Sequence, residues 1–175
     1  MKWISEDFKN LSELFVNQLR VMLSAEEQIV RELPNLVIRA TDSELQQAFR
    51  MHLEESEEHI KRLERILGEE KSKNPAADAI GPVKCKTMAS LGTEAEEMIL
   101  DARDEWVRDV ALIAAAQRME HYEIAGYGAL RQWARLLGEH QMADLLDQTL
   151  KEEGHADHLL SSIAERVNPK AKKAA

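Results

Sequence analysis

The sequence predicts an all-α protein that folds as an antiparallel four-helix bundle, and three observations predict it. Good helix formers dominate the 175 residues, whereas Pro and Gly number only 4 and 7. Apolar residues recur at helical spacing in four long segments. Two of the three connections between those segments are very short and the third is long. Each long segment is therefore expected to be a core-facing helix.

The first two long segments are expected to form a helical hairpin. The first begins with Ser5 as its N-cap and runs to about Arg39, with a kink at Pro34 because Pro lacks a backbone hydrogen-bond donor. The second begins at the turn over residues 41–43 and ends near Gly68. Because the turn is so short, the two helices are expected to be antiparallel.

The middle of the chain has the weakest helical pattern. Residues 69–82 contain two Pro and one Gly, which is typical of a linker. We expect a short helix over residues 83–91 and another after Gly92. Cys85, the only cysteine, excludes an intrachain disulfide and is expected to be a small packing residue.

The last two long segments are expected to form a second hairpin, over residues 104–137 and 139–167. Gly138 between them is a natural C-terminal stop for the first helix. Gly126 and Gly128 predict close packing against a neighbouring helix. Both helices again carry one apolar face.

The lengths of the connections define the topology. Connections in helical bundles usually have about two to eight residues, whereas the central one here has about 35. One long crossover between two hairpins is the ferritin-like arrangement. We expect one ferritin-like domain over residues 1–168, with short extra helices in the crossover, and a flexible Lys- and Ala-rich tail over residues 169–175.

Charge and hydropathy exclude several classes of partner. The net charge of −9 argues against nucleic acid binding, because phosphates need a basic face. It favours the attraction of cations. No apolar run approaches the roughly 20 residues of a membrane helix, and the first ten residues lack a signal-peptide core. We therefore expect a cytoplasmic protein with no membrane partner.

Each long helix carries at least one glutamate among apolar neighbours, on the face expected to point inward. In each hairpin, one such glutamate per helix lies about 15 residues from the turn, or about 22 Å at a rise of 1.5 Å per residue. These side chains should therefore meet at one level in the middle of the bundle. The predicted inward set is Glu26, Glu55, Glu120, Glu123 and Glu153.

A buried set of carboxylates repels itself, and a pair of divalent metal ions would balance its charge. Oxygen-rich sites with a histidine suit iron or manganese better than zinc. We expect two iron ions, or two manganese ions, per chain. Glu120 or a neighbour would bridge them, and His59 would be a further ligand.

Two alternatives remain for the metal ligands from the last helix. They are Glu153 with Asp157, or Glu152 with His155. His52 is expected to orient a carboxylate rather than to bind metal itself.

Five segments of the sequence resemble the YciF-type stress proteins of bacteria, a ferritin-like family. They are AEEQ at 25–28, HLEES at 52–56, VRDVALIAAAQ at 107–117, EHYEIA at 120–125 and LKEE at 150–153. The resemblance implies a ferritin-like bundle, a homodimer, a site layout related to that of rubrerythrin and a link to stress conditions. It implies no settled activity. Ser56 departs from the Glu-x-x-His motif of di-iron proteins, since it stands three residues before His59.

Two hypotheses of function follow. The first is a dinuclear metal protein that reacts with oxygen or peroxide, with ferroxidase-like or peroxidase-like activity. The second is a non-catalytic structural or stress protein that dimerises through the bundle and keeps a vestigial or unoccupied metal site. Metal content distinguishes the two.

Overall fold

Five α-helices form the part of the chain that the computed structural model describes, which is residues 8–73 and 83–173. No strand occurs within these ranges. The helices are α1 (Leu11–Arg39), α2 (Ser43–Lys73), α3 (Lys86–Asp101), α4 (Glu105–Leu136) and α5 (His140–Ala171). The prediction of an all-α fold is therefore confirmed.

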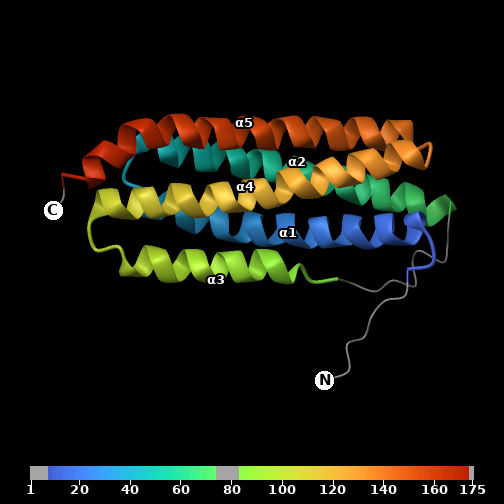
Figure 1. Ribbon diagram of the computed structural model, residues 1–175, viewed down its shortest axis with the longest axis horizontal. Helices are drawn as coiled ribbons and strands as arrows, with labels where there is room; N and C mark the ends of the chain where they lie inside the picture. Colours follow the sequence, from blue (N-terminus) through green and yellow to red (C-terminus); the bar gives the residue numbers. More distant parts are fainter. Residues whose placement is uncertain (1–7, 74–82, 174–175) are drawn as a thin grey trace, which may run out of the picture.

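The four long helices make a bundle of two hairpins, and α3 lies outside it (Figure 1). Helix α1 packs along α2, and α4 packs along α5. The hairpins meet where α1 contacts α4 and where α2 contacts α5, whereas α3 covers the seam between α1 and α4. This is the ferritin-like arrangement predicted from the loop lengths.

The helix ends show why the chain turns where it does. Asn10 caps α1 by accepting a hydrogen bond from the amide of Glu13 at 2.9 Å, while the predicted cap Ser5 lies outside the described residues. Asp104 caps α4 by accepting two amide hydrogen bonds. Gly138 ends α4 with a φ of 81°, a left-handed conformation that glycine adopts without strain.

Four helix boundaries differ from the sequence predictions, beginning with the start of α1 at Leu11 rather than after Ser5. Helix α2 continues through Gly68 to Lys73, so the first part of the predicted linker is helical. Helix α3 is one helix that passes through Gly92, because Met88, Ala95 and Ile99 bury one face of it; that packing outweighs the cost of about 1 kcal/mol for a glycine.

Helix α5 continues beyond the predicted end at Val167. It passes through Pro169 and ends at Ala171. The side chain of Lys170 lies 3.9 Å from the ring centroid of Trp106, which ties this last turn to α4. Helix α1 likewise passes through Pro34 to its end at Arg39.

Only one of the two glycines predicted to allow close packing does so. A Cβ atom on Gly126 would lie 2.5 Å from Sδ of Met22, so α1 and α4 approach closely there. A Cβ on Gly128 would meet nothing within 4 Å, and the prediction is wrong at that position.

The apolar core is divided into two clusters. One includes Leu33, Leu45 and Ile163 near the α1–α2 turn, and the other includes Phe15 and Leu130 near the α4–α5 turn. Fully buried polar side chains lie at the level between them. Among the described residues, no helix is apolar over a stretch long enough to span a bilayer.

Candidate metal centre

Buried acidic and histidine side chains from all four bundle helices meet in the layer between the two apolar clusters. Each of them is at most 7% exposed, and four are completely buried. They are Glu26 from α1, His52 and His59 from α2, Glu120 and Glu123 from α4, and Glu153 from α5.

These side chains form two clusters that share one residue. In the first, one donor atom from each of His52, Glu120, Glu123 and Glu153 lies within 4.8 Å of all the others. In the second, Glu26, His59 and Glu153 meet the same limit. The common member, Glu153, lies between two positions at which a cation could be held.

Several of the oxygens in these clusters lack a hydrogen-bond partner among the described residues. Both oxygens of Glu123 are orphaned, as are Oε2 of Glu26 and Oε2 of Glu120. Glu153 contacts only histidine rings, with Oε1 at 3.1 Å from Nδ1 of His59 and Oε2 at 3.9 Å from Nδ1 of His52. Buried polar groups are normally paired, because burial without a partner costs about 1–3 kcal/mol for each group. Hard oxygen donors with two imidazole nitrogens are a ligand set that iron or manganese accepts. The residues therefore fit a pair of such ions.

The electrostatics of the clusters are those of an acidic site that holds protons. Burial, and then the charge of Glu153, raises the pKa of both Glu120 and Glu123 well above the ordinary value. Although burial alone would lower the pKa of His59, the carboxylates of Glu153 and Glu26 raise it to about 10. Although burial opposes ionisation of Glu153, its contacts with His59 and His52 lower its pKa. A metal would have to displace such protons.

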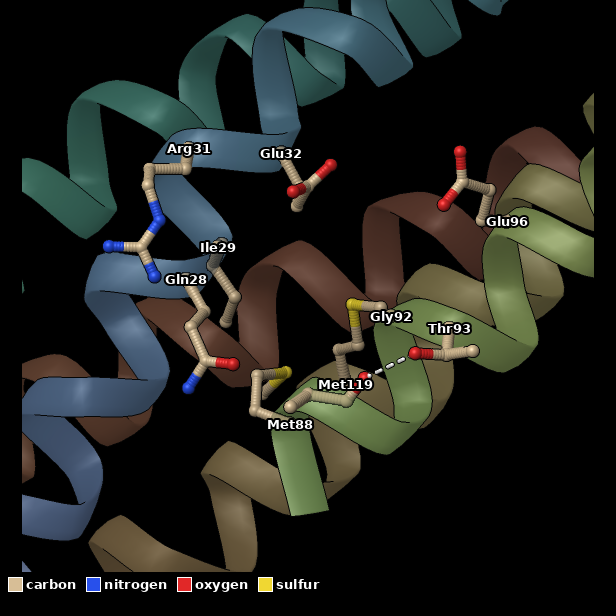
Figure 2. Close-up of a pocket in the computed structure, with 10 residues that line it drawn as sticks. Gln28, Ile29, Arg31, Glu32, Met88, Gly92, Thr93, Glu96 and Met119 are labelled. Atoms are coloured by element: carbon tan, nitrogen blue, oxygen red, sulfur yellow. Dashed lines mark hydrogen bonds between the residues drawn. The ribbon is translucent and has the colours of Figure 1, made fainter. Parts of the chain in front are cut away.

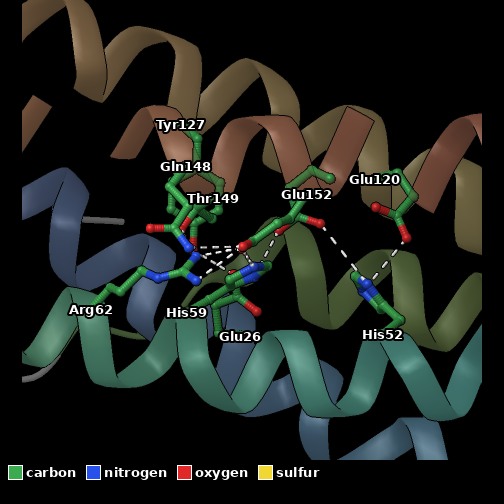
Figure 3. Close-up of polar contacts among 10 residues, drawn as sticks. Glu26, His52, His59, Arg62, Glu120, Tyr127, Gln148, Thr149 and Glu152 are labelled. Carbon is green, nitrogen blue, oxygen red and sulfur yellow. Dashed lines mark hydrogen bonds and ion pairs between the residues drawn. The ribbon is translucent and has the colours of Figure 1, made fainter. Parts of the chain in front are cut away.

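The ring of His59 is fixed from both sides (Figure 3). Its Nδ1 lies 3.1 Å from Oε1 of Glu26 and 3.1 Å from Oε1 of Glu153. Its Nε2 lies 2.9 Å from Oε2 of Glu152, which pairs in turn with the guanidinium of Arg62. With Nε2–H donating to Glu152, Nδ1 faces Glu26 and Glu153, where it would bind a cation that displaces its proton. Carboxylates orient the histidine ligands of metals in this way.

Comparison with known proteins places the chain in a family. Residues 10–172 match the model of the family described as "Domain of unknown function (DUF892)". This chain belongs to the DUF892 family. It is 40% identical to Protein YciF of Escherichia coli (strain K12) over 166 residues, which are 94% of this chain and 97% of that protein. The resemblance to YciF-type proteins predicted from the sequence is confirmed.

Two solved structures are similar to this DUF892 chain. The crystal structure of the E. coli stress protein YciF matches with a TM-score of 0.85 and 39% identity, over 93% of this chain and 99% of that one. YcfI from Rhodopseudomonas palustris, provisionally described as a structural protein, matches with a TM-score of 0.80 and 33% identity, over 91% and 98% of the two chains.

Five of the seven residues predicted as metal ligands come together in the DUF892 bundle. These are Glu26, His59, Glu120, Glu123 and Glu153. The other two, Glu55 and Asp157, are half-buried and belong to neither cluster.

The remaining residues of the last helix also lie apart from the clusters. Asp157 accepts a hydrogen bond from Gln117 at 3.2 Å. Of the alternative pair, Glu152 contacts the far side of the His59 ring and His155 is exposed.

Three neighbours of the clusters were missed or given another role by the sequence. His52 lies inside the first cluster, and its spacing of seven residues from His59 was the available signal. Tyr127 is fully buried and donates a hydrogen bond to Oε1 of Glu26. Arg62 lies one turn after His59, but only the packing of α2 on α5 brings it to Glu152.

A separate hollow of about 240 Å³ lies between α1 and α3 (Figure 2). Its apolar lining includes Ile29, Met88 and Met119, and Glu32 and Glu96 stand on its rim. None of the residues that line it belongs to either cluster. The candidate chemistry of the protein therefore lies in the bundle core.

Proposed function

We propose that this protein is a ferritin-like dinuclear metal protein that binds two iron or two manganese ions in the middle of its bundle. One observation carries the proposal. Six buried side chains present orphaned oxygens and imidazole nitrogens to two adjoining points, and Glu153 belongs to both groups. A pair of divalent cations supplies the charge and the coordination that the chain itself does not.

The six residues divide between the two positions. Glu26 and His59 would hold one ion, and His52 with Glu120 would hold the other. Glu153 is shared between the clusters and is the proposed bridge, with Glu123 beside it in the first cluster.

The chain's own groups prepare the site for chemistry. Burial of every ligand excludes bulk water. Arg62 and Glu152 hold the His59 ring, and Tyr127 keeps its proton at Oη, where it donates to Glu26; burial and then the charge of Glu26 raise the pKa of Tyr127. When bound, iron or manganese would supply one-electron chemistry with oxygen or peroxide, as in a ferroxidase or a peroxidase.

Anaerobic reconstitution with Fe(II), followed by desalting and elemental analysis, tests the proposal. Wild-type protein should retain two irons per chain. The Glu26→Ala and Glu120→Ala variants should lose binding, whereas Glu57→Ala, which removes an exposed carboxylate from α2, should retain full content. A wild-type protein that retains no iron, or cluster variants that retain all of it, would contradict the proposal.

A second function, that of a structural protein without metal, is favoured by the description of YcfI. It would require the polar layer to be satisfied by the chain. The orphaned oxygens of Glu26, Glu120 and Glu123 argue against that within the described residues. Both functions are compatible with the proposed homodimer, and with action under stress as in the related E. coli stress protein. Sedimentation of the metal-loaded and metal-free protein measures whether dimerisation depends on the metal.

A further inference from the structure

An acidic hollow lies on the surface between α2 and α5, beside the proposed metal site. It has a volume of about 280 Å³ and opens widely to solvent. Its lining consists of Met51, Glu54, Glu55, Glu58, Arg62 and Glu152. Four of these six residues are carboxylates and one is a cation, so the hollow attracts cations.

Two carboxylates of this hollow are free to meet an incoming cation. Glu58 pairs with Lys61, and Glu152 pairs with Arg62. Among the described residues, Glu54 and Glu55 make no hydrogen bond or ion pair, and Glu55 is the more buried of the two.

A second, narrow cavity continues inward from the hollow. It shares Met51 and Glu55 with the hollow, so these two residues stand where the two spaces meet. Its inner end includes His52 and Glu120, which belong to the four-residue cluster. Its volume open to water is about 10 Å³, which is room for about one water molecule or one ion without its hydration shell.

Two atoms that could ligate a metal, and that lack a hydrogen-bond partner, line this inner cavity. Nδ1 of His52 and Oε2 of Glu120 are buried and lack a hydrogen-bond partner among the described residues. A cation that leaves the hollow at Glu55 would therefore find two donors before it reaches Glu153. Each space therefore shares residues with the next. The hollow and the cavity share Glu55, and the cavity and the first cluster share His52 and Glu120.

We propose that this series is the entry route for divalent cations, and that Glu55 is the carboxylate that receives the hydrated ion and passes it to His52 and Glu120. The inference rests on the proposed metal site and adds to it the path by which the site fills. It also gives Glu55 a role outside the ligand set. The hollow between α1 and α3 shares no residue with either cluster and offers no such connection.

Stopped-flow loading of the metal-free, full-length protein with Co(II), followed by the visible absorption of the bound ion, tests the route. Three proteins are compared at low ionic strength: wild type, Glu55→Gln, and the matched control Glu57→Gln, which removes the same charge from an exposed position on the same helix. Metal content at equilibrium is measured for each by elemental analysis.

The Glu55→Gln protein should load about tenfold more slowly, because the substitution removes a negative charge that attracts the incoming divalent ion. It should reach the same final content as wild type, and Glu57→Gln should load at the wild-type rate. The difference between Glu55→Gln and wild type should shrink in about 0.5 M salt, which screens the attraction.

Three results would overturn the route. Equal rates for Glu55→Gln and wild type would show that ions enter elsewhere. A lower final content in Glu55→Gln would make Glu55 a ligand instead. Equal slowing by Glu57→Gln would reduce the effect to net charge. A wild-type protein that takes up no Co(II), Fe(II) or Mn(II) at all would overturn the proposed function itself. That outcome is distinguishable from the other three, because in each of those the wild-type protein still binds metal.

Discussion

Two of the regions that bury carboxylates in this bundle treat them in opposite ways. At the α1–α2 turn, Asp109 is completely buried and accepts the amide hydrogens of Thr41 and Asp42, each at 2.8 Å. In the middle of the bundle, Glu123 is equally buried, yet neither of its oxygens has a partner among the described residues.

Asp42 completes the first region. It accepts amide hydrogens from Glu44 and Leu45 at the start of α2, and it pairs with Arg166 on α5. The hydrogen bond and charge of Arg166 lower the pKa of Asp42, whereas burial and the neighbouring carboxylates raise the pKa of Glu123. The contrast supports the proposal that the mid-bundle carboxylates take a cation from outside the chain, whereas the turn carboxylates stabilise the fold by themselves.

The largest expected effect is on metal binding, at the residue that both clusters share. Glu153→Gln keeps the shape of the side chain but removes its charge from both positions. We expect it to weaken Mn(II) binding by about 100-fold or more. Titration of the metal-free protein, followed by the electron paramagnetic resonance of free Mn(II), measures the loss. Unchanged affinity would remove Glu153 from the proposed site.

Asp109→Ala should be the most destabilising change at the turn. It leaves the amides of Thr41 and Asp42 without an acceptor. We expect the free energy of unfolding to fall by about 2–4 kcal/mol. Urea denaturation of the metal-free protein measures this. A loss below 0.5 kcal/mol, at the level of a neutral surface change, would show that water replaces the carboxylate without cost.

Glu123→Met should increase the free energy of unfolding, which is the opposite of the effect of Asp109→Ala. It replaces an unpaired buried carboxyl with an apolar side chain of similar length that the bundle can pack. In metal-free protein we expect the free energy of unfolding to rise by about 1–3 kcal/mol. If the variant is less stable than wild type under the same urea denaturation, the mid-bundle carboxylates are satisfied by the fold after all.

Asp42→Asn should give the smallest effect and should change the dependence on pH. The folded pKa of Asp42 is below its unfolded value, so its stabilisation is present above about pH 4 and is lost as the pH falls toward the folded pKa. We expect a loss of about 1–2 kcal/mol at pH 6. At pH 2 the difference from wild type should be clearly smaller than at pH 6, because part of the stabilisation is then lost. Urea midpoints at the two pH values check this, and an equal difference at both would exclude ionisation of Asp42 as its source.

The sequence was sufficient for the fold because the relevant signals are local. Helical periodicity, the Gly138 stop and the connection lengths define the topology without tertiary information. Helix ends were less predictable. Helices were predicted to end at Gly68 and before Gly92, but tertiary packing maintains both helices through these glycines.

The site was predictable to the level of a helix face and no further. Periodicity placed Glu55 inward, but a residue at the edge of that face turns toward α5 and the solvent hollow. His52 shows the same limit in the other direction. It was expected only to orient a carboxylate, but it lies inside the first cluster. The contact between Arg62 and Glu152 depends on how α2 packs against α5, which one sequence does not encode in its spacing.

Thermal unfolding with and without metal tests the central claim most directly. If the mid-bundle carboxylates require cations, Mn(II) at about 1,000 times its dissociation constant should stabilise wild-type protein by about 4 kcal/mol, or a Tm higher by about 10 °C than in EDTA. Glu153→Gln should show no such shift. Equal Tm values for wild-type protein in Mn(II), in Fe(II) under anaerobic conditions and in EDTA would contradict the account.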